Sequence, residues 1–279
     1  MSTVVIGKRG LCEDFILQSR KTWNTIRQAC KVRLNISEES ITDFNLLELQ
    51  KRHRHDIHTY KYSKQKESRY GADWEWWLTS NGWFLGLRVQ AKKIQPKTLS
   101  YPYLNHLTPT GVRQIDALIT QSAAASHLEI PIYVFYNFWD CSQYHAPWPC
   151  TFRKRNIRAL GCGIVEARAL RTIIDQGKNG LKDIARMMYP WSCPICCWKY
   201  SGNKTLPFRA FDFLSKAFRN ITDFTYEQDR FVTKEAPWYV YRILEGAESL
   251  DEELDKLGIN RVTVIEEHNA KSSENVLFT

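Results

Sequence analysis

The chain has 279 residues, of which 43% are hydrophobic and 13% aromatic, enough for one elaborated domain or two small ones. Its 39 Lys and Arg residues outnumber its 30 Asp and Glu residues, and the formal net charge of +9 favours polyanionic partners. No run of about 20 apolar residues is present, and the first residues lack the zones of a signal peptide. We therefore expect a cytoplasmic protein without a membrane segment.

Two helices are expected first. Apolar residues recur at helical spacing from Glu13 to Cys30, and a second helix begins near Ser37, a plausible N-cap, in SEESITDFNLLELQKR. The predicted buried stripe of the second helix is Ile41, Phe44, Leu46 and Leu47.

Three extended segments follow, at 57–62, 72–78 and 83–94, with SNG at 80–82 as a hairpin turn between the last two. They predict an antiparallel β-meander. In GADWEWWL (71–78), a period of two places Asp73 and Glu75 on one face and the tryptophans at 74 and 76 on the other. This acidic face requires an explanation.

A helix is predicted over 109–126, followed by the apolar strand IPIYVFYN (130–137), whose continuous hydrophobicity fits a central position. The fold class expected is α/β, with a mixed β-sheet flanked by helices. Residues 1–138 form the core in this interpretation, and residues 139–279 an α-rich C-terminal elaboration with a Cys-rich loop. The pattern does not decide whether the second part is a separate domain.

Acidic, amide and basic side chains are expected to converge on this sheet. Glu39 lies on the second helix, and Asp73 lies at the start of one strand of the hairpin. Gln90 and Lys92 share one face of the next strand, with Ala91 opposite. The hairpin can bring that face beside Asp73.

These segments resemble the PD-(D/E)XK superfamily of restriction-endonuclease-like nucleases. In that family a helix supplies a Glu, one strand an Asp and the next strand acid-x-Lys, which match Glu39, Asp73 and Gln90-Ala91-Lys92 in order. The segments TDFNLLEL, GADWEWW, VQAKK and PIYVFYN also look like an uncharacterised bacterial group placed in this superfamily. The resemblance covers roughly residues 35–137 and implies a restriction-endonuclease-like core.

The resemblance implies a Mg²⁺-dependent (or Mn²⁺-dependent) endonuclease that hydrolyses phosphodiester bonds. Asp73, Gln90, the Ala91 carbonyl and Glu39 would hold the metal, and Lys92 would orient or deprotonate a water. Position 90 departs from the family, where most members carry Asp or Glu. A neutral amide should bind Mg²⁺ more weakly, which makes Glu75 a candidate substitute carboxylate.

Basic residues concentrate at 20–33, 51–66 and 152–158, interleaved with aromatic residues and histidines, a mixture suited to nucleic acid. The candidate nucleic-acid contacts are Arg52, Arg54, Lys93 and Gln114. The resemblance implies DNA as substrate, a role in bacterial antiviral defence or restriction, and a homodimer. The alternatives are a catalytically impaired nucleic-acid-binding module of the same fold and a protein-interaction scaffold.

Eight cysteines without a secretory signal predict reduced thiols. Cys193 and Cys196 form half of a structural zinc site, with Cys141, His145, Cys150 or Cys162 as the remaining candidate ligands. Buried thiols are the alternative, and the lack of a second C-x-x-C pair favours them.

Overall fold

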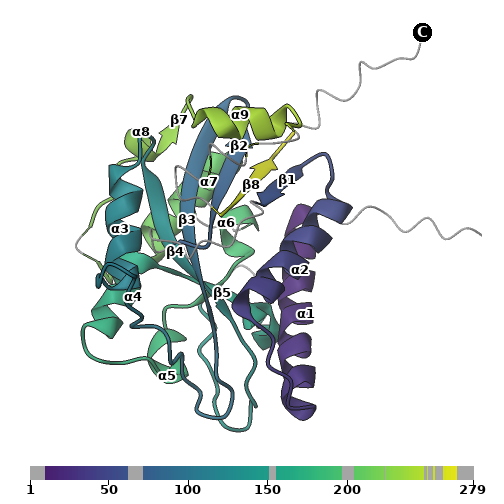
Figure 1. Ribbon diagram of the computed structural model, residues 1–279, viewed down its shortest axis with the longest axis vertical. Helices are drawn as coiled ribbons and strands as arrows, with labels where there is room; N and C mark the ends of the chain where they lie inside the picture. The colour runs from purple at the N-terminus through teal and green to yellow at the C-terminus, as the bar shows by residue number, and fades with distance from the viewer. Residues whose placement is uncertain are drawn as a thin grey trace, which may run out of the picture.

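The computed structural model describes residues 10–61, 72–150, 155–196, 204–222, 224–247, 250, 254 and 260–268. The helices are α1 (Leu11–Lys31), α2 (Glu38–Arg52), α3 (Gln114–Ala124), the 3-10 helix η1 (Ile157–Gly161), α4 (Ala167–Ile174), α5 (Leu181–Ile184), α6 (Cys193–Cys196), α7 (Leu206–Ala217), α8 (Gln228–Phe231) and α9 (Trp238–Leu244). The strands are β1 (Ile57–Lys61), β2 (Trp74–Ser80), β3 (Trp83–Lys93), β4 (Glu129–Tyr136), β5 (Cys162–Glu166), β6 (Tyr189–Pro190), β7 (Val232–Thr233) and β8 (Arg261–Glu266). Figure 1 shows their arrangement.

The strands form one eight-stranded open sheet in the order β1-β8-β2-β3-β4-β5-β6, with β7 paired to β3. β2 and β3 form the antiparallel hairpin, β4 runs parallel to β3, and β5 runs antiparallel to β4. The predicted α/β class with a mixed sheet and flanking helices is therefore confirmed.

The meander differs from the expectation at one place. β8, from the C-terminal part of the chain, lies between β1 and β2, antiparallel to the first and parallel to the second. Strands from both predicted parts of the chain thus alternate in a single sheet. Residues 271–279 lie outside the described residues.

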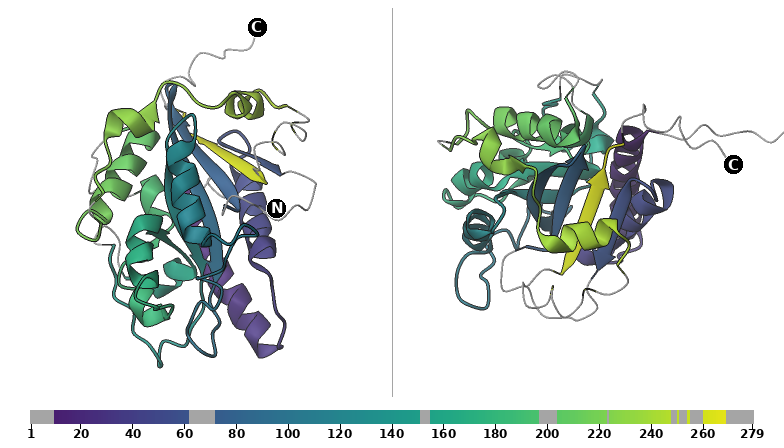
Figure 2. Two further views of the ribbon diagram at one scale, coloured as in Figure 1. Left: turned by 60° about the vertical axis from the view of Figure 1, so that its left-hand side comes forward. Right: turned by 90° about the horizontal axis from the view of Figure 1, so that it is seen from above.

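Helices cover both faces of the sheet (Figure 2). On one face, Trp74 and Trp76 pack in the main core with Phe15 of α1 and Trp191, and the ring centroids of Phe15 and Trp191 are 5.0 Å apart. α1, α2 and α7 lie on this side. On the other face, Trp77 packs with α9 in a second apolar cluster. The tryptophans of GADWEWWL therefore anchor β2 from both sides.

The cysteines correct one prediction. Cys12 of α1 and Cys196 of α6 form a disulfide with a Cα–Cα distance of 5.5 Å, whereas the sequence predicted reduced thiols throughout. The two residues are 184 positions apart, and only the packing of α6 beside α1 brings them together. Within the described ranges, no helix is both long enough and apolar enough to cross a membrane.

Gly161 ends η1 where that turn rests on α1. A Cβ atom at this position would lie 2.0 Å from the Ser19 carbonyl oxygen and 2.9 Å from the Trp23 backbone nitrogen. Because both atoms belong to the α1 backbone, we expect Gly161→Ala to lower the free energy of unfolding by about 3 kcal/mol.

Chemical denaturation would measure this change. Gly180→Ala is the matched control, because its Cβ would approach only the movable side chains of Asp183 and Lys182. Equal stability of the two variants would contradict the close approach of η1 to α1.

Candidate functional site

The β2–β3 register brings the predicted site residues together. Glu75 lies opposite Arg88 and Trp74 opposite Val89. The backbone nitrogen of Asp73 donates to the Val89 carbonyl at 2.8 Å, so the pairing continues to the point where Asp73 meets Gln90. The face predicted from a period of two is therefore the one the structure shows.

Asp73 is held by two hydrogen bonds from β3. Its Oδ2 accepts from Gln90 Nε2 and from the Ala91 backbone nitrogen, each at 2.7 Å. Burial raises the pKa of Asp73, and the bond from Ala91 and the charge of Lys92 oppose that rise. The two hydrogen bonds thus fix the position of this carboxylate, although burial disfavours its charged form.

Glu38 rather than Glu39 joins this group. Glu38 Oε1 accepts from the Lys93 backbone nitrogen at 2.7 Å, whereas the Glu39 side chain is 70% exposed and pairs with Lys61. Burial raises the pKa of Glu38, and its charge interacts with Lys92 and Asp73. The acidic side chain from α2 that lies beside β3 is therefore Glu38, and the sequence-based choice of Glu39 was wrong by one residue.

The physical reason is the rotation of α2. Its buried side consists of Ile41, Thr42, Asn45, Leu46 and Leu49. Phe44 and Leu47, which the sequence predicted as buried, are 66% and 54% exposed. A stripe through 41, 42 and 45 shares its side with position 38, three or four residues earlier, and leaves Glu39 on the solvent side with Asp43.

Lys92 lies on the same side of β3 as Gln90. Its Nζ donates to Gln114 Oε1 at 2.6 Å, so the first residue of α3, which the sequence offered as a nucleic-acid contact, fixes the ammonium group. Burial lowers the pKa of Lys92, and the carboxylates of Glu38 and Asp73 oppose this. Lys92 can therefore lose its proton more readily than an exposed lysine.

Glu75 is not available as a substitute metal ligand. It is 2% exposed, and its Oε1 accepts from Arg88 Nη2 at 2.7 Å. Its Oε2 accepts from Tyr239 and from Trp77 Nε1. Arg88 also donates from Nε to Glu129 at 2.6 Å. The Glu75 carboxylate thus belongs to a buried ionic network that fixes the hairpin register.

Tyr133 is a residue that the sequence reasoning missed. It lies opposite Gln90 in the β3–β4 register, and its buried hydroxyl has no hydrogen-bond partner among the described residues. Burial raises the pKa of Tyr133, and the charge of Asp73 adds to the rise. The available signal was a hydroxyl group in the middle of a strand whose immediate neighbours are apolar.

The donor set fits a hard cation such as Mg²⁺. The buried Gln90 Oε1 lacks a hydrogen-bond partner among the described residues, an orphaned oxygen beside a carboxylate. Gln90 Nε2 donates to both Asp73 Oδ2 and the Ala91 carbonyl oxygen, so these two oxygens already converge on one positively polarised group. Mg²⁺ is commonly held by one or two carboxylates together with water and substrate phosphates.

The predicted nucleic-acid contacts separate into two places. Lys93 Nζ donates to Asn35 Oδ1 at 2.6 Å and to the Ile36 carbonyl, close to Glu38. Arg52 is the last residue of the 15-residue helix α2, about 20 Å along the helix from Glu38, and Arg54 follows beyond the C-cap. Parts of two basic clusters, 62–66 and 152–154, lie outside the described residues.

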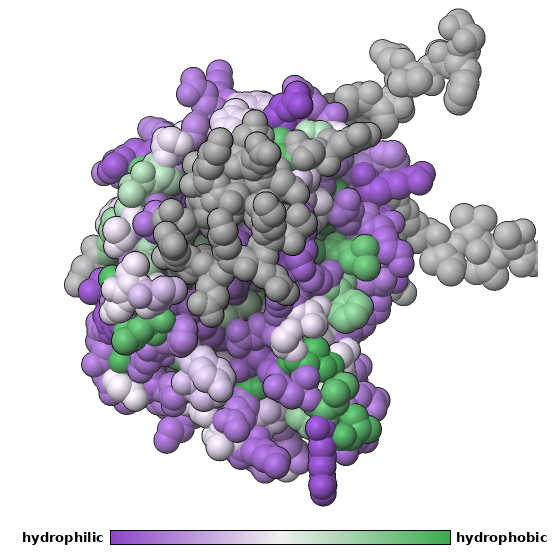
Figure 3. Space-filling view, viewed as in Figure 1, coloured by the Kyte–Doolittle hydropathy of each residue, from purple (hydrophilic) through white to green (hydrophobic). Residues whose placement is uncertain are grey.

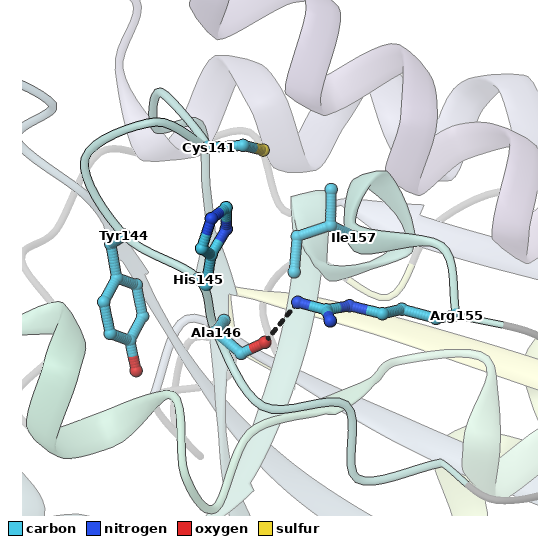
Figure 4. A pocket seen from close by; sticks show the side chains of 6 residues that line it. All are labelled: Cys141, Tyr144, His145, Ala146, Arg155 and Ile157. Atoms are coloured by element: carbon cyan, nitrogen blue, oxygen red, sulfur yellow. Dashed lines mark hydrogen bonds between the residues drawn. The ribbon is translucent and has the colours of Figure 1, made fainter.

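The zinc prediction is corrected. Cys196 is bonded to Cys12, so its sulfur cannot join Cys193 as a thiolate ligand. Cys141 and His145 instead line a separate hollow with Tyr144 and Arg155 (Figure 4). Across the described ranges, no three His, Cys, Asp or Glu side chains gather closely enough to hold a metal.

The comparison with protein families places the whole described fold in one family. The model of a family of unknown function, DUF6615, matches residues 11–271, and the chain belongs to that family. A search of curated proteins finds no match to the chain.

Proposed function

We propose that this member of DUF6615 is a metal-dependent nuclease that hydrolyses phosphodiester bonds of DNA. The observation that carries the proposal is the convergence of one fixed carboxylate, an orphaned amide oxygen and a buried lysine, contributed by Asp73, Gln90 and Lys92. The resemblance to PD-(D/E)XK nucleases rests on the same residues. Glu38 takes the place expected for Glu39.

The residues have distinct roles in this proposal. Asp73 supplies the charged ligand, and Gln90 and the Ala91 carbonyl supply neutral oxygens. When bound, Mg²⁺ or Mn²⁺ stabilises the negative charge that develops on the phosphoryl oxygens. Lys92, held by Gln114, neutralises a phosphate oxygen or accepts a proton from the attacking water, and its lowered pKa suits the second role.

One observation favours a second candidate, a nucleic-acid-binding module without catalysis. Gln90 is neutral where most members of the resembled superfamily carry an acid, so the site has one negative charge fewer to hold a divalent cation. This module would bind DNA through the basic residues predicted from the sequence, and its affinity would fall steeply with salt.

A cleavage assay separates the two candidates. The native protein would be incubated with supercoiled plasmid, linear duplex, single-stranded DNA and RNA, with Mg²⁺, Mn²⁺ or EDTA. Cleavage that requires the metal supports the nuclease, and its substrate range tests the choice of DNA. Salt-sensitive binding without cleavage under every condition favours the binding module.

Two neighbouring glutamates provide a matched pair of variants. We expect Glu38→Gln to lower the cleavage rate about 10- to 100-fold, because Glu38 contacts β3 beside the site and its charge acts on Lys92. Glu39→Gln should leave the rate unchanged, because that side chain is exposed and pairs with Lys61. The reverse order of effects would restore the sequence-based assignment of Glu39 and contradict the structural one.

A further inference from the structure

A hollow of about 510 Å³ lies next to the candidate site. Its walls come from the end of α1, the connection between α1 and α2, the first residue of α2, the end of β3 and the segment after it. We call it the Tyr103 groove, because Tyr103, 68% exposed, forms one side of it. Its volume is in the range of small-ligand pockets.

The lining of the groove combines polar and apolar residues, and the apolar ones gather around Tyr103 in the sequence and at the ends of α1 and β3. Leu34, which is 62% exposed, Ile94 and the prolines at 96 and 102 line it together with Tyr103. Figure 3 shows hydrophobic residues gathered on the right-hand side of the molecule, over α1 and α2. An exposed aromatic ring beside prolines provides flat apolar faces on which a planar ring can stack.

The groove borders the candidate site through two residues, Glu38 and Lys93. Glu38 and Lys93 line it and are joined by the hydrogen bond from the Lys93 backbone nitrogen. The charge of Glu38 also acts on Lys92, the residue before Lys93 in β3, whose side chain points to the opposite face of the strand. Glu38 is thus a neighbour of both the groove and the candidate site.

The charges around the groove suit a phosphate-linked ligand. Lys93 and Lys97 both act on Cys30 in the groove wall, so two positive charges lie close to it. The ammonium of Lys93 is fixed by Asn35 and the Ile36 carbonyl. Apolar stacking faces next to fixed cations are the combination that binds single-stranded nucleic acid.

We propose that the Tyr103 groove binds one unpaired nucleotide of the substrate strand, with its base on Tyr103 and its phosphate toward Lys93 and Lys97. This inference rests on the proposed function, since it takes the substrate strand from the candidate site. The preferred substrate is then a duplex with a single-stranded overhang or an unpaired nucleotide beside the cleaved bond.

Equilibrium binding without metal tests the groove independently of cleavage. The probes are a blunt DNA duplex and the same duplex with a short overhang containing 2-aminopurine, both in EDTA. The native protein should bind the overhang duplex more tightly and quench the 2-aminopurine fluorescence. Tyr103→Ala should lose about tenfold in affinity for the overhang duplex and little for the blunt one, and Tyr103→Trp should retain the preference.

Phe44→Ala is the matched control, because Phe44 is an exposed aromatic residue outside the groove. Equal binding of both duplexes by the native protein, or no effect of Tyr103→Ala, would overturn the proposal. A change in oligomeric state of Tyr103→Ala without a change in DNA binding would also overturn it and indicate a contact between proteins.

The two proposals fail separately. If the native protein cleaves DNA and Tyr103→Ala binds the overhang normally, the groove inference is wrong and the nuclease stands. If overhang binding depends on Tyr103 in a protein that cleaves nothing, the nuclease is wrong and the groove stands.

Discussion

Asp73→Asn should lower metal-dependent cleavage about 100- to 1,000-fold, the loss typical of removing one electrostatic contributor to a transition state. Asn keeps the size of the side chain, and its Oδ1 can still accept from the Ala91 backbone nitrogen, which donates to Asp73 at 2.7 Å. The variant loses the negative charge and exchanges one acceptor oxygen for an NH2 group. Initial cleavage rates in Mg²⁺ and Mn²⁺ would measure the change.

Stability provides a second, opposite readout for the same variant. Because burial raises the pKa of Asp73, its charged form is less favourable in the folded protein than in the unfolded chain. A carboxylate with a raised pKa stabilises the fold at low pH and loses that contribution as the pH rises through its folded value. Asp73→Asn should therefore be more stable than the native protein without metal, and the difference should widen above the ordinary aspartate pKa of about 4.

Added Mg²⁺ should reverse this order. The native protein gains stability from a ligand that binds only the folded state, and Asp73→Asn gains little. Asp175→Asn is a matched control, because Asp175 pairs with Arg113 on the surface. Full cleavage by Asp73→Asn, or a loss of stability in metal-free buffer, would contradict the assignment of Asp73 as the charged ligand.

The local pattern of the sequence was sufficient for the hairpin and for its acidic face. A period of two placed Asp73, Gln90 and Lys92 on one side, and the structure shows that arrangement because the antiparallel pairing of β2 and β3 preserves it. Ser37 was likewise recognisable as an N-cap, and its side chain accepts from the Ser40 backbone nitrogen at 3.0 Å. Such features depend on neighbours within a few residues.

Features that depend on distant segments were not readable in this way. The rotation of α2 is set by Tyr136 of β4, whose hydroxyl lies 2.7 Å from Thr42 Oγ1, and by the core around Leu49. Apolar content alone favoured Phe44 and Leu47 as buried residues. With that stripe facing the core, the sequence pointed to Glu39 instead of Glu38. The disulfide and the insertion of β8 likewise join segments far apart in the chain.

Arg88→Met should lower the free energy of unfolding by about 3–5 kcal/mol, the range measured when one partner of a buried ion pair is removed. Arg88 is 8% exposed and contacts both Glu75 and Glu129, each 2% exposed. Met fills much of the same volume but leaves two carboxylates close together without a cation. Denaturant unfolding at neutral pH would measure the loss, and exposed Arg242→Met is the control.

The pH dependence of this loss identifies its cause. Burial and the nearby Glu75 carboxylate raise the pKa of Glu129 to about 8, although the charge of Arg88 opposes the rise. A raised carboxyl pKa means stability that is present at low pH and lost as the pH rises through about 8. The native protein should lose stability over this range, and Glu129→Gln should reduce that loss.

Without Arg88 the same acids lose their cation, so the destabilisation by Arg88→Met should be largest near pH 8 and smaller near pH 5. A loss independent of pH would instead indicate that packing around Met is responsible. Glu75 and Arg88 each lie two residues along their strands from Asp73 and Gln90. Weakening of the Glu75–Arg88 pair as the pH rises should therefore also lower the cleavage rate. The ionic network would then stabilise the fold and hold the candidate metal ligands in register.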